Sequence, residues 1–564
     1  MIKDMRTIGT FLPIRQMAFN LTKLRKKCQN SNYQMAVNMS LVFLGCTFDL
    51  LNVAGIISVI EDLESMYDLK YTQASWALTS YAITFAGFIA FMGRLGDIVG
   101  NSVLFTFSCF FFTLFSLLCA VVNNFAVFAV FRALQGISAA GIVPCGYALI
   151  PILAHPNEVQ KFFSIVSCGF SSTIGLGLII GGAFALTNIG HKGIFYLTFA
   201  GMFIVSFAAL LFTYKIESEQ FIGQGKSLED QTVPIIDDGP KLASLDFLGS
   251  FIFIAGSILI VVGLTKGGDS WKKPVAYVPF AIGVILFLGF FIWNCYYMKI
   301  IKVLSLFGVE RTSYFDKVEV LIPEKVLFMK NFIPIVFGFA CNNACLFSCI
   351  YIIDQYSQYV EKNSPLLAGV KLVPLIVIMV GGNALCALKS VKLRPRIGVA
   401  VGFFSMFAGC IILIQIRHIQ DKLYWKILFC AQILVGFGAS IFYPYGLKLV
   451  VGDAPSDSKG IASGITQTFG QLGIELTFSV MVSVLGNITE VLGKPNSVQT
   501  FRDGFQKCTY FTLAVATLGF ILMTFFLRED HKLANDLESE LVSSVELQEH
   551  EKLDSKAKNS NDGN

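Results

Sequence analysis

The chain has 564 residues, of which 54% are hydrophobic and only 14% charged. A soluble globular protein of average composition is much less apolar, so that class is excluded and a membrane protein is indicated. The formal net charge of +5 excludes little, because the charges lie in loops and tails, and the chain shows no nucleic-acid signal.

The first 34 residues form a polar arm with basic residues close to the first apolar run. Lys23 and Arg25 lie there, whereas the loop after that run carries acidic residues such as Glu61. The positive-inside rule therefore predicts a cytoplasmic N-terminus. Because the first apolar run begins near Met35, behind the arm, we predict no cleavable signal peptide and expect the first helix to serve as its own insertion signal.

Fourteen apolar runs are long enough to cross a hydrocarbon core of about 30 Å as helices. They are continuous, which excludes a transmembrane barrel built from short alternating segments. We therefore predict an all-α polytopic membrane protein, with spans at 35–60, 72–92, 103–122, 125–153, 162–186, 194–214, 244–265, 275–297, 331–353, 365–388, 397–416, 425–450, 460–485 and 508–527.

The spans group as six, two and six. They form a first half at 35–214, two extra helices at 244–297 and a second half at 331–527. The polar segments are the basic arm at 1–34, a linker at 215–243, a segment at 298–330 and a tail at 528–564, which we expect to be disordered. An even count predicts that both termini are cytoplasmic. It also places the sequon at Asn487 outside, where glycosylation is possible.

A glycine-rich motif follows the second span. Gly93, Arg94, Asp97 and Gly100 stand in the segment GRLGDIVG, which resembles the G-x-x-x-D-x-x-G signature between the second and third helices of the major facilitator superfamily. The usual basic residues around the aspartate are missing. We expect a tight hinge in which glycines let helix ends approach and Asp97 lies at the N-terminus of the third helix, where negative charge is favoured.

The two sets of six helices also match the internal repeats of major facilitator transporters, in which substrate passes near the midplane between two halves. With the extra central pair, residues 35–527 resemble the fourteen-span drug:proton antiporter family. Within it, the closest resemblance is to fungal members linked to aminotriazole and boron resistance and to a related branch proposed to facilitate ammonium movement. The resemblance implies a major facilitator fold and a monomer.

Asp49 lies in the segment FDLLNVA, which resembles an aspartate-containing motif in the first helix of fourteen-span members. It falls about 21 Å along a helix that begins near Met35. A carboxylate within the membrane is costly and is by default a functional-site hypothesis. A proton site and a structural carboxylate tied to a neighbouring helix both remain open. Asn52, one turn further, is expected to line the same face and the substrate path.

Arg132 and Gln135 stand in RALQG, close to the R-x-x-Q-G motif of the superfamily, whose arginine is implicated in proton coupling. Arg132 comes out at about the same depth as Asp49, counted along the two helices. We therefore expect the two side chains to be able to pair. An arginine stays charged in proteins, so it would act on a partner rather than carry the proton. Gln135 is a further candidate for the substrate path.

The fifth span carries Gly175, Gly177, Gly181 and Gly182 in a segment that resembles the antiporter motif of the fifth helix. The proline that follows the second glycine in that motif is replaced by Leu178. The motif separates exporters from symporters in the superfamily, so efflux is less firmly indicated than transport. Glycines that only permit tight helix packing are the alternative.

The second half adds three charged candidates and one amide. Asp354 and Lys371 are expected either to pair across a hairpin or to act as interfacial anchors. Gln355, which fits the family pattern, and Lys371 are substrate-path candidates. Glu475 lies about 22 Å into the thirteenth span. It is a candidate second proton or cation site, with a structural hydrogen-bonded carboxyl as the alternative.

These features predict a transporter rather than an enzyme, since the chain shows no nucleophile elbow or phosphate loop. The 14 cysteines are scattered and read as packing residues, and no metal or cofactor is expected. The first hypothesis is proton-coupled export of small toxic or drug-like solutes. The second is a uniporter-like facilitator of a small solute such as ammonium or borate, and the third a transporter-like sensor. The plasma membrane is the expected location, with the vacuolar membrane as the alternative. The expected partners are solute, protons and lipid.

Overall fold

The computed structural model describes residues 34–59, 63, 66–68, 74, 76–154, 158–185, 187–213, 245–306, 320–363, 365–388, 394–417, 423–485 and 497–527. The predicted linker at 215–243, the tail at 528–564 and Asn487 lie outside these residues, as does the basic arm except for Gln34. The described part of the chain is almost entirely helical and contains fourteen helices long and apolar enough to cross a membrane. This confirms the predicted count.

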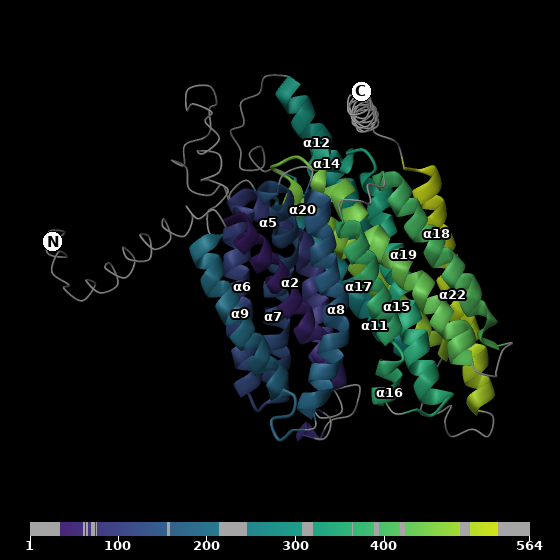
Figure 1. The fold of residues 1–564 in the computed structure, drawn as a ribbon. Helices are drawn as coiled ribbons and strands as arrows, with labels where there is room; N and C mark the ends of the chain where they lie inside the picture. Colours follow the sequence, from purple (N-terminus) through teal and green to yellow (C-terminus); the bar gives the residue numbers. More distant parts are fainter. Residues whose placement is uncertain are drawn as a thin grey trace, which may run out of the picture.

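The first half consists of α2 (Gln34–Ser58), α5 (Trp76–Val99), α6 (Asn101–Val121), α7 (Phe125–Leu153), α8 (Val159–Ala185) and α9 (Lys192–Phe212). The extra pair is α11 (Phe247–Asp269) and α12 (Pro274–Leu306). The second half consists of the short α14 (Glu324–Leu327), then α15 (Phe332–Tyr359), α16 (Pro365–Val370), α17 (Val373–Ala387), α18 (Pro395–Leu413), α19 (Phe429–Leu447), α20 (Lys459–Leu485) and α22 (Ser497–Phe525), with short η segments flanking α18 and α19. Figure 1 shows the first half on the left and the second on the right.

The two halves meet mainly along α5 with α20 and α8 with α17, and less extensively along α7 with α20 and α8 with α19. At the upper end in Figure 1, glycines allow the backbones of α5 and α20 to touch. A Cβ atom added at Gly93 would lie 2.2 Å from the carbonyl oxygen of Gly460, and one at Gly464 would lie 2.8 Å from Cα of Ala90. Small residues at such crossings are the usual means of close helix approach in membranes. Larger side chains would force these halves apart.

The extra pair packs against the outside of this junction. Besides α12, α11 contacts α5 and α20, and so touches both halves. Asp246 caps its N-terminus by accepting a hydrogen bond from the Gly249 N–H at 2.7 Å, and the Trp293 indole of α12 donates to the same carboxyl at 3.3 Å. The side chain of Asn294 exchanges two hydrogen bonds with the backbone of Ile322. Hydrogen bonds therefore connect α12 to the segment that precedes α14 and α15.

Several predicted helix ends were wrong. The predicted second span ends at 92, but α5 continues to Val99, so the expected glycine turn is helical up to Gly100, the only residue of GRLGDIVG with a positive φ, at 108°. The predicted ninth span ends at 353, whereas α15 reaches Tyr359. The predicted last span begins at 508, whereas α22 begins at Ser497. Hydropathy marks where a helix leaves lipid, and the hydrogen-bonded helix runs on beyond that point.

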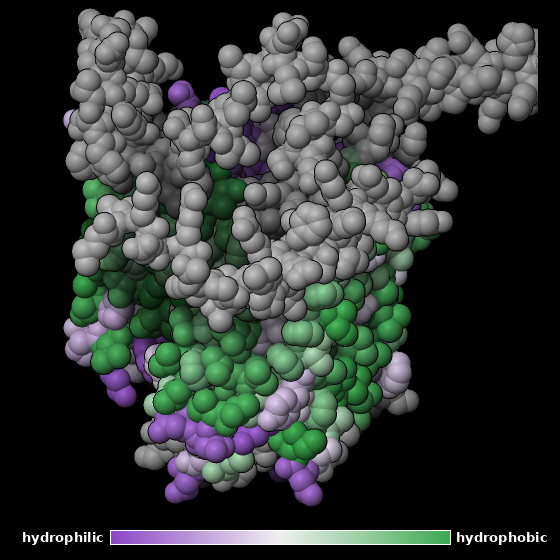
Figure 2. All heavy atoms as spheres, turned by 90° about the vertical axis from the view of Figure 1, so that its left-hand side faces the viewer, coloured by the Kyte–Doolittle hydropathy of each residue, from purple (hydrophilic) through white to green (hydrophobic). Residues whose placement is uncertain are grey.

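The outward faces of the helices carry apolar side chains. On α6 and α9 these include the exposed Phe107, Phe110, Phe203 and Phe207. Figure 2 shows this side as a hydrophobic band, with hydrophilic side chains gathered at its lower end. A soluble protein rarely exposes so large an apolar area. With the fourteen apolar helices, this makes the chain a multi-pass membrane protein.

Candidate functional site

Asp49 of α2, Tyr81 of α5 and Arg132 of α7 come together inside the first half. The Tyr81 hydroxyl donates a hydrogen bond to Asp49 Oδ1. Arg132 Cζ lies 4.6 Å from the centre of the Tyr81 ring, within the range of a cation–π interaction. Asp49 is 6% exposed and Arg132 is fully buried. The tyrosine therefore joins the buried carboxyl and the buried guanidinium.

The guanidinium of Arg132 is held by neutral acceptors. Its Nε donates to the Ala77 carbonyl at 2.8 Å, and its Nη1 donates to Asn52 Oδ1 at 2.5 Å and to Gln135 Oε1 at 2.6 Å. The two amides are fixed in turn, because Asn52 donates to Thr198 at 3.1 Å and Gln135 to Ser116 at 2.7 Å. Five helices thus orient one arginine.

Asp49 and Arg132, which we expected to be able to pair, form no direct ion pair. Among the described residues, neither side chain has an ion-pair partner. The physical reason is the position of Tyr81. Its hydroxyl donates a hydrogen bond to the Asp49 carboxyl, while its ring faces the Arg132 guanidinium. Asn52 and Gln135, the substrate-path candidates of the first half, accept hydrogen bonds from Arg132. The arrangement offers one group that can exchange a proton next to a charge that does not titrate.

Asp97 joins the two halves. Its Oδ1 accepts a hydrogen bond from the Gly460 N–H at 2.7 Å and its Oδ2 one from the Ile461 N–H at 2.8 Å, and Asn101 donates to Oδ1 at 3.2 Å. The aspartate, expected at the N-terminus of the third helix, contacts Asn101, the first residue of α6, and its carboxyl also lies at the N-terminus of α20, in the second half. Unpaired N–H groups and the helix dipole favour a negative charge there. Arg94, also in the motif, is buried close by at 4% exposure.

The four glycines of α8 face different neighbours. Cβ atoms added at Gly177 and Gly181 would meet α2, at 2.5 Å from Cβ of Ala54 and 2.3 Å from the Gly55 carbonyl oxygen. One at Gly175 would meet Ile376 of α17 in the other half at 2.7 Å, and one at Gly182 would meet nothing within 4 Å. The motif therefore serves packing inside the first half at two positions and contact between the halves at one.

Glu475 lies apart from the Asp49 cluster. Gln471, one turn earlier on α20, donates to its Oε1 at 3.5 Å. Thr265 of α11 also faces the carboxyl. The neighbouring apolar contacts join Leu472 with Ile83 of α5 and Val261 of α11. Glu475 thus sits where the extra pair packs on the two halves.

Gln355 belongs to the last turns of α15, and Lys371 follows α16, the helix near the lower end of the second half in Figure 1. Lys371, at the break between α16 and α17, forms an ion pair with Glu361, and its backbone carbonyl accepts a hydrogen bond from the Tyr424 hydroxyl at 3.0 Å. The pairing of Lys371 with Asp354 that we considered does not form, because the break points the lysine at the loop after α15. Asp354 accepts instead from Gln355 and from Gln358, each at 2.9 Å.

A small pocket between the halves, lined by both polar and apolar side chains, contains none of the predicted substrate-path residues. It is lined from α8, α15, α17 and α19 by Ser167, Phe170, Ser171, Asn342, Asn343, Leu346, Met379, Asn383, Ala439, Ser440 and Tyr443. Among these described residues none carries a charge. The sequence signal that could have found it is the set of asparagines inside otherwise apolar runs.

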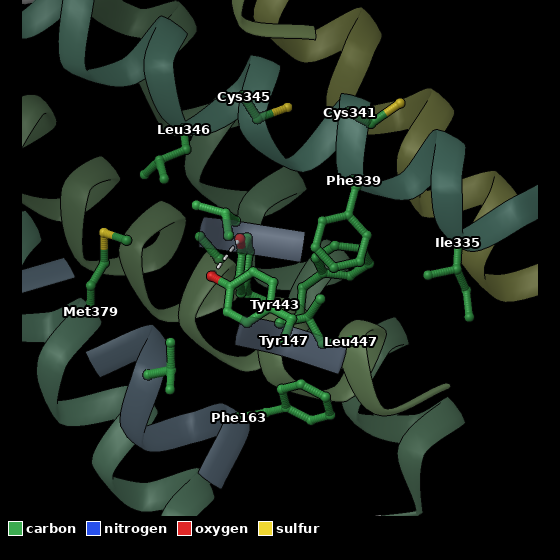
Figure 3. Close-up of a cluster of buried hydrophobic side chains, with 14 of the residues drawn as sticks. Tyr147, Phe163, Ile335, Phe339, Cys341, Cys345, Leu346, Met379, Tyr443 and Leu447 are labelled. Atoms are coloured by element: carbon green, nitrogen blue, oxygen red, sulfur yellow. Dashed lines mark hydrogen bonds between the residues drawn. The ribbon is translucent and has the colours of Figure 1, made fainter. Parts of the chain in front are cut away.

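Tyr443, which lines this pocket, contacts a tyrosine of the first half. The hydroxyls of Tyr147 on α7 and Tyr443 on α19 lie 3.4 Å apart, and Gln467 of α20 donates to Tyr443 at 3.1 Å. Figure 3 shows the two hydroxyls facing each other, with Phe339 packed against Tyr443 at 5.1 Å between ring centres. This contact links the halves close to the pocket. Within the described part of the chain, no cluster of three or more His, Cys, Asp or Glu residues could hold a metal.

The fold and these motifs point to one family. A model of the Major Facilitator Superfamily matches residues 42–477, well over half of the chain. The chain belongs to the Major Facilitator Superfamily. It is therefore a membrane transporter and not an enzyme, and the predicted major facilitator fold is confirmed.

Known members of the superfamily resemble this chain at low identity. The MFS-type transporter FPY5 of Fusarium mangiferae is 24% identical over 60% of this chain and 53% of its own length. The efflux pump terJ of Aspergillus terreus is 22% identical over 90% of this chain and 91% of the pump. The solved structure of the human organic anion transporter MFSD10 matches with a TM-score of 0.57 and 14% identity, over 87% of this chain and 99% of that one. The last likeness concerns the fold alone.

Proposed function

We propose that this chain is a proton-coupled exporter of small toxic or drug-like solutes that works by alternating access. The observation that carries the proposal is the buried Asp49 carboxyl. It accepts a hydrogen bond from the Tyr81 hydroxyl, and the Tyr81 ring separates it from the fixed charge of Arg132. A buried carboxyl beside a permanent charge is suited to taking up and releasing a proton as its surroundings change. The likeness to an efflux pump supports the direction of transport.

In this mechanism Asp49 takes up a proton from outside, and Arg132 and Tyr81 respond to its change of charge. Uptake shifts the balance between two arrangements of the halves, and the contacts that change are those of Asp97 with α20 and of Tyr147 with Tyr443. A proton can shift that balance only if it binds the two arrangements with different affinity. Solute leaves in the outward-open arrangement, where the proton binds, and the proton is released inward after the halves have switched. Glu475 is a second proton site in this proposal.

A uniporter-like facilitator of a small solute such as ammonium or borate is the second candidate. The observation in its favour is the fifth helix, where Leu178 replaces the proline of the antiporter motif. Two of the glycines there only pack on α2. A facilitator needs no titrating carboxyl, and Asp49 would then hold Tyr81 in place.

The proposal also includes the subfamily, the oligomeric state, the membrane and the orientation of the transporter. We assign it to the fourteen-span drug:proton antiporter family and to its aminotriazole- and boron-resistance branch. It acts as a monomer in the plasma membrane, or alternatively the vacuolar membrane, with both termini cytoplasmic. The upper end in Figure 1 is then the cytoplasmic end, and Asn487 is a glycosylation site on the outer side.

The test measures intracellular borate, methylammonium and aminotriazole in cells that lack or overproduce the protein, with and without a protonophore. Export below diffusive equilibrium that the protonophore abolishes supports the exporter. Faster equilibration in both directions, regardless of the gradient, supports the facilitator. Asp49→Asn separates coupling from folding if the variant reaches its membrane. If that variant exports uphill as well as the wild type, the proton-site role of Asp49 is wrong.

A further inference from the structure

The pocket between the halves combines apolar side chains with uncharged polar ones. Ser171 belongs to the first half, and Asn342, Asn383, Ser440 and Tyr443 belong to the second. A solute held here touches both halves, which is what alternating access requires of a substrate site. The inference below rests on the proposed function, because it takes this pocket as the solute site of that transporter.

Asn383 presents an acceptor that has no partner. Its Nδ2 donates to the Met379 carbonyl at 2.9 Å and to Ser171 Oγ at 3.2 Å. A carbonyl can only accept, so this contact fixes which end of the amide is nitrogen. Its Oδ1 is buried and makes no hydrogen bond, although the residue is only 1% exposed.

Asn342 repeats this arrangement on α15. It is also 1% exposed, its Nδ2 donates to Asn343 Oδ1 at 3.1 Å, and its own Oδ1 has no hydrogen-bond partner. Leaving a buried polar atom without a partner is unfavourable, because the atom has lost its hydrogen bonds to water. Two such acceptors on the lining of one pocket therefore favour a ligand that brings hydrogen-bond donors.

We propose that the pocket selects small, uncharged solutes that carry O–H or N–H donors. Donors on the solute satisfy the oxygens of Asn342 and Asn383. The hydroxyls of Ser171 and Ser440 donate to the backbone carbonyls of Ser167 and Phe437, so their oxygens can also accept from the solute. A cation or an anion would enter without a counter-charge, which is costly in a buried site. Charged solutes are therefore disfavoured, because none of the described residues that line the pocket carries a charge.

The size of the pocket limits the arrangement of the halves in which a solute can bind. The cavity measures about 10 Å³, room for about one water molecule. A solute fits only when α8 moves away from α17, and this movement breaks the hydrogen bond between Ser171 and Asn383. Solute donors then replace a contact between the halves.

The test uses the full-length protein in proteoliposomes and compares urea with guanidinium, two planar molecules of similar size that differ in charge. Tetramethylurea, which has no N–H donor, and glycerol, a neutral donor of another shape, complete the set. Exchange of labelled urea and glycerol is expected, with guanidinium and tetramethylurea at least tenfold slower. Exchange of guanidinium at the rate of urea, or no exchange of either neutral donor, overturns the assignment.

Variants locate the effect in the pocket. Asn383→Leu and Asn342→Leu should each slow urea exchange at least tenfold, whereas Asn383→Asp, which has the same shape and adds a charge, should shift preference toward guanidinium. Asn38→Leu is the matched control, since Asn38 is equally buried but bonds to Thr213 away from the pocket. Equal loss in all three leucine variants would mean a folding defect and no pocket role.

The two proposals fail in different ways. If neutral donors are exchanged but a proton gradient never drives their accumulation, proton-coupled export is wrong and the solute class stands. If a gradient drives only charged solutes uphill, export stands and the solute class is wrong.

Discussion

Replacing Asp97 by alanine removes two hydrogen bonds that join the halves, those from the N–H groups of Gly460 at 2.7 Å and Ile461 at 2.8 Å. Loss of an aspartate cap costs about 0.5–2 kcal/mol, and bonds to a charged acceptor lie at the upper end of such values. A loss of about 2 kcal/mol shifts an equilibrium roughly 30-fold. The shift favours the arrangement in which α20 has left α5.

Spin labels at Lys161 of α8 and Lys325 of α14, one on each half, report that arrangement as a distance distribution in a background without reactive cysteines. The Asp97→Ala protein should populate longer distances, and Asp97→Asn, which keeps one carbonyl acceptor, should show a smaller change. Asp354→Asn near the opposite end is the control. A wild-type distribution in Asp97→Ala would refute the idea that this cap holds the halves together.

Three further changes test the packing, the arginine cluster and the extra pair. Gly93→Ala places a Cβ 2.2 Å from the Gly460 carbonyl oxygen and should cost about 1–3 kcal/mol of stability in thermal denaturation, while Gly182→Ala, with nothing within 4 Å, should cost little. Arg132→Lys keeps the charge and loses the fork that reaches two side-chain carbonyls, so transport should fall roughly tenfold or more at equal surface expression. Burial raises the pKa of Asp246, the cap of α11. An acid with a higher pKa in the folded chain lowers stability as the pH rises from about 3.9 through the folded value. Melting temperature should therefore fall over that window, and Asp246→Asn should flatten the fall.

The number of membrane helices could be predicted because each must hide its backbone from lipid with about twenty apolar residues. The residues at which these helices begin and end could not be predicted, because they depend on contacts made outside the lipid. Gly93 and Gly96 look like turn residues in the sequence. In the structure both are helical, and Gly93 is small because the backbone of α20 crosses there. Nothing within α5 itself indicates that crossing.

The charged part of the site was visible in the sequence because a charge in an apolar run is rare and costly. Asp49 and Arg132 were found in this way, whereas the role of Tyr81 depends on how α5 packs between α2 and α7. The pocket was missed for a related reason. A neutral amide such as Asn383 stands out little from its apolar neighbours, and its partner Ser171 is 212 residues away.

The contacts between the halves differ in kind along the bundle, and this difference bears on how the transporter moves. Near the pocket they are neutral and long, at 3.2 Å between Asn383 and Ser171 and 3.4 Å between Tyr147 and Tyr443. At the α5 end, the Asp97 carboxylate accepts two shorter bonds. Hydrogen bonds with a charged partner are roughly twice as strong as neutral ones. Opening at the Asp97 end is therefore the costlier movement, and a ligand with equal affinity for both arrangements cannot drive it. The proton or the solute must gain contacts in the opened form that the closed form does not offer.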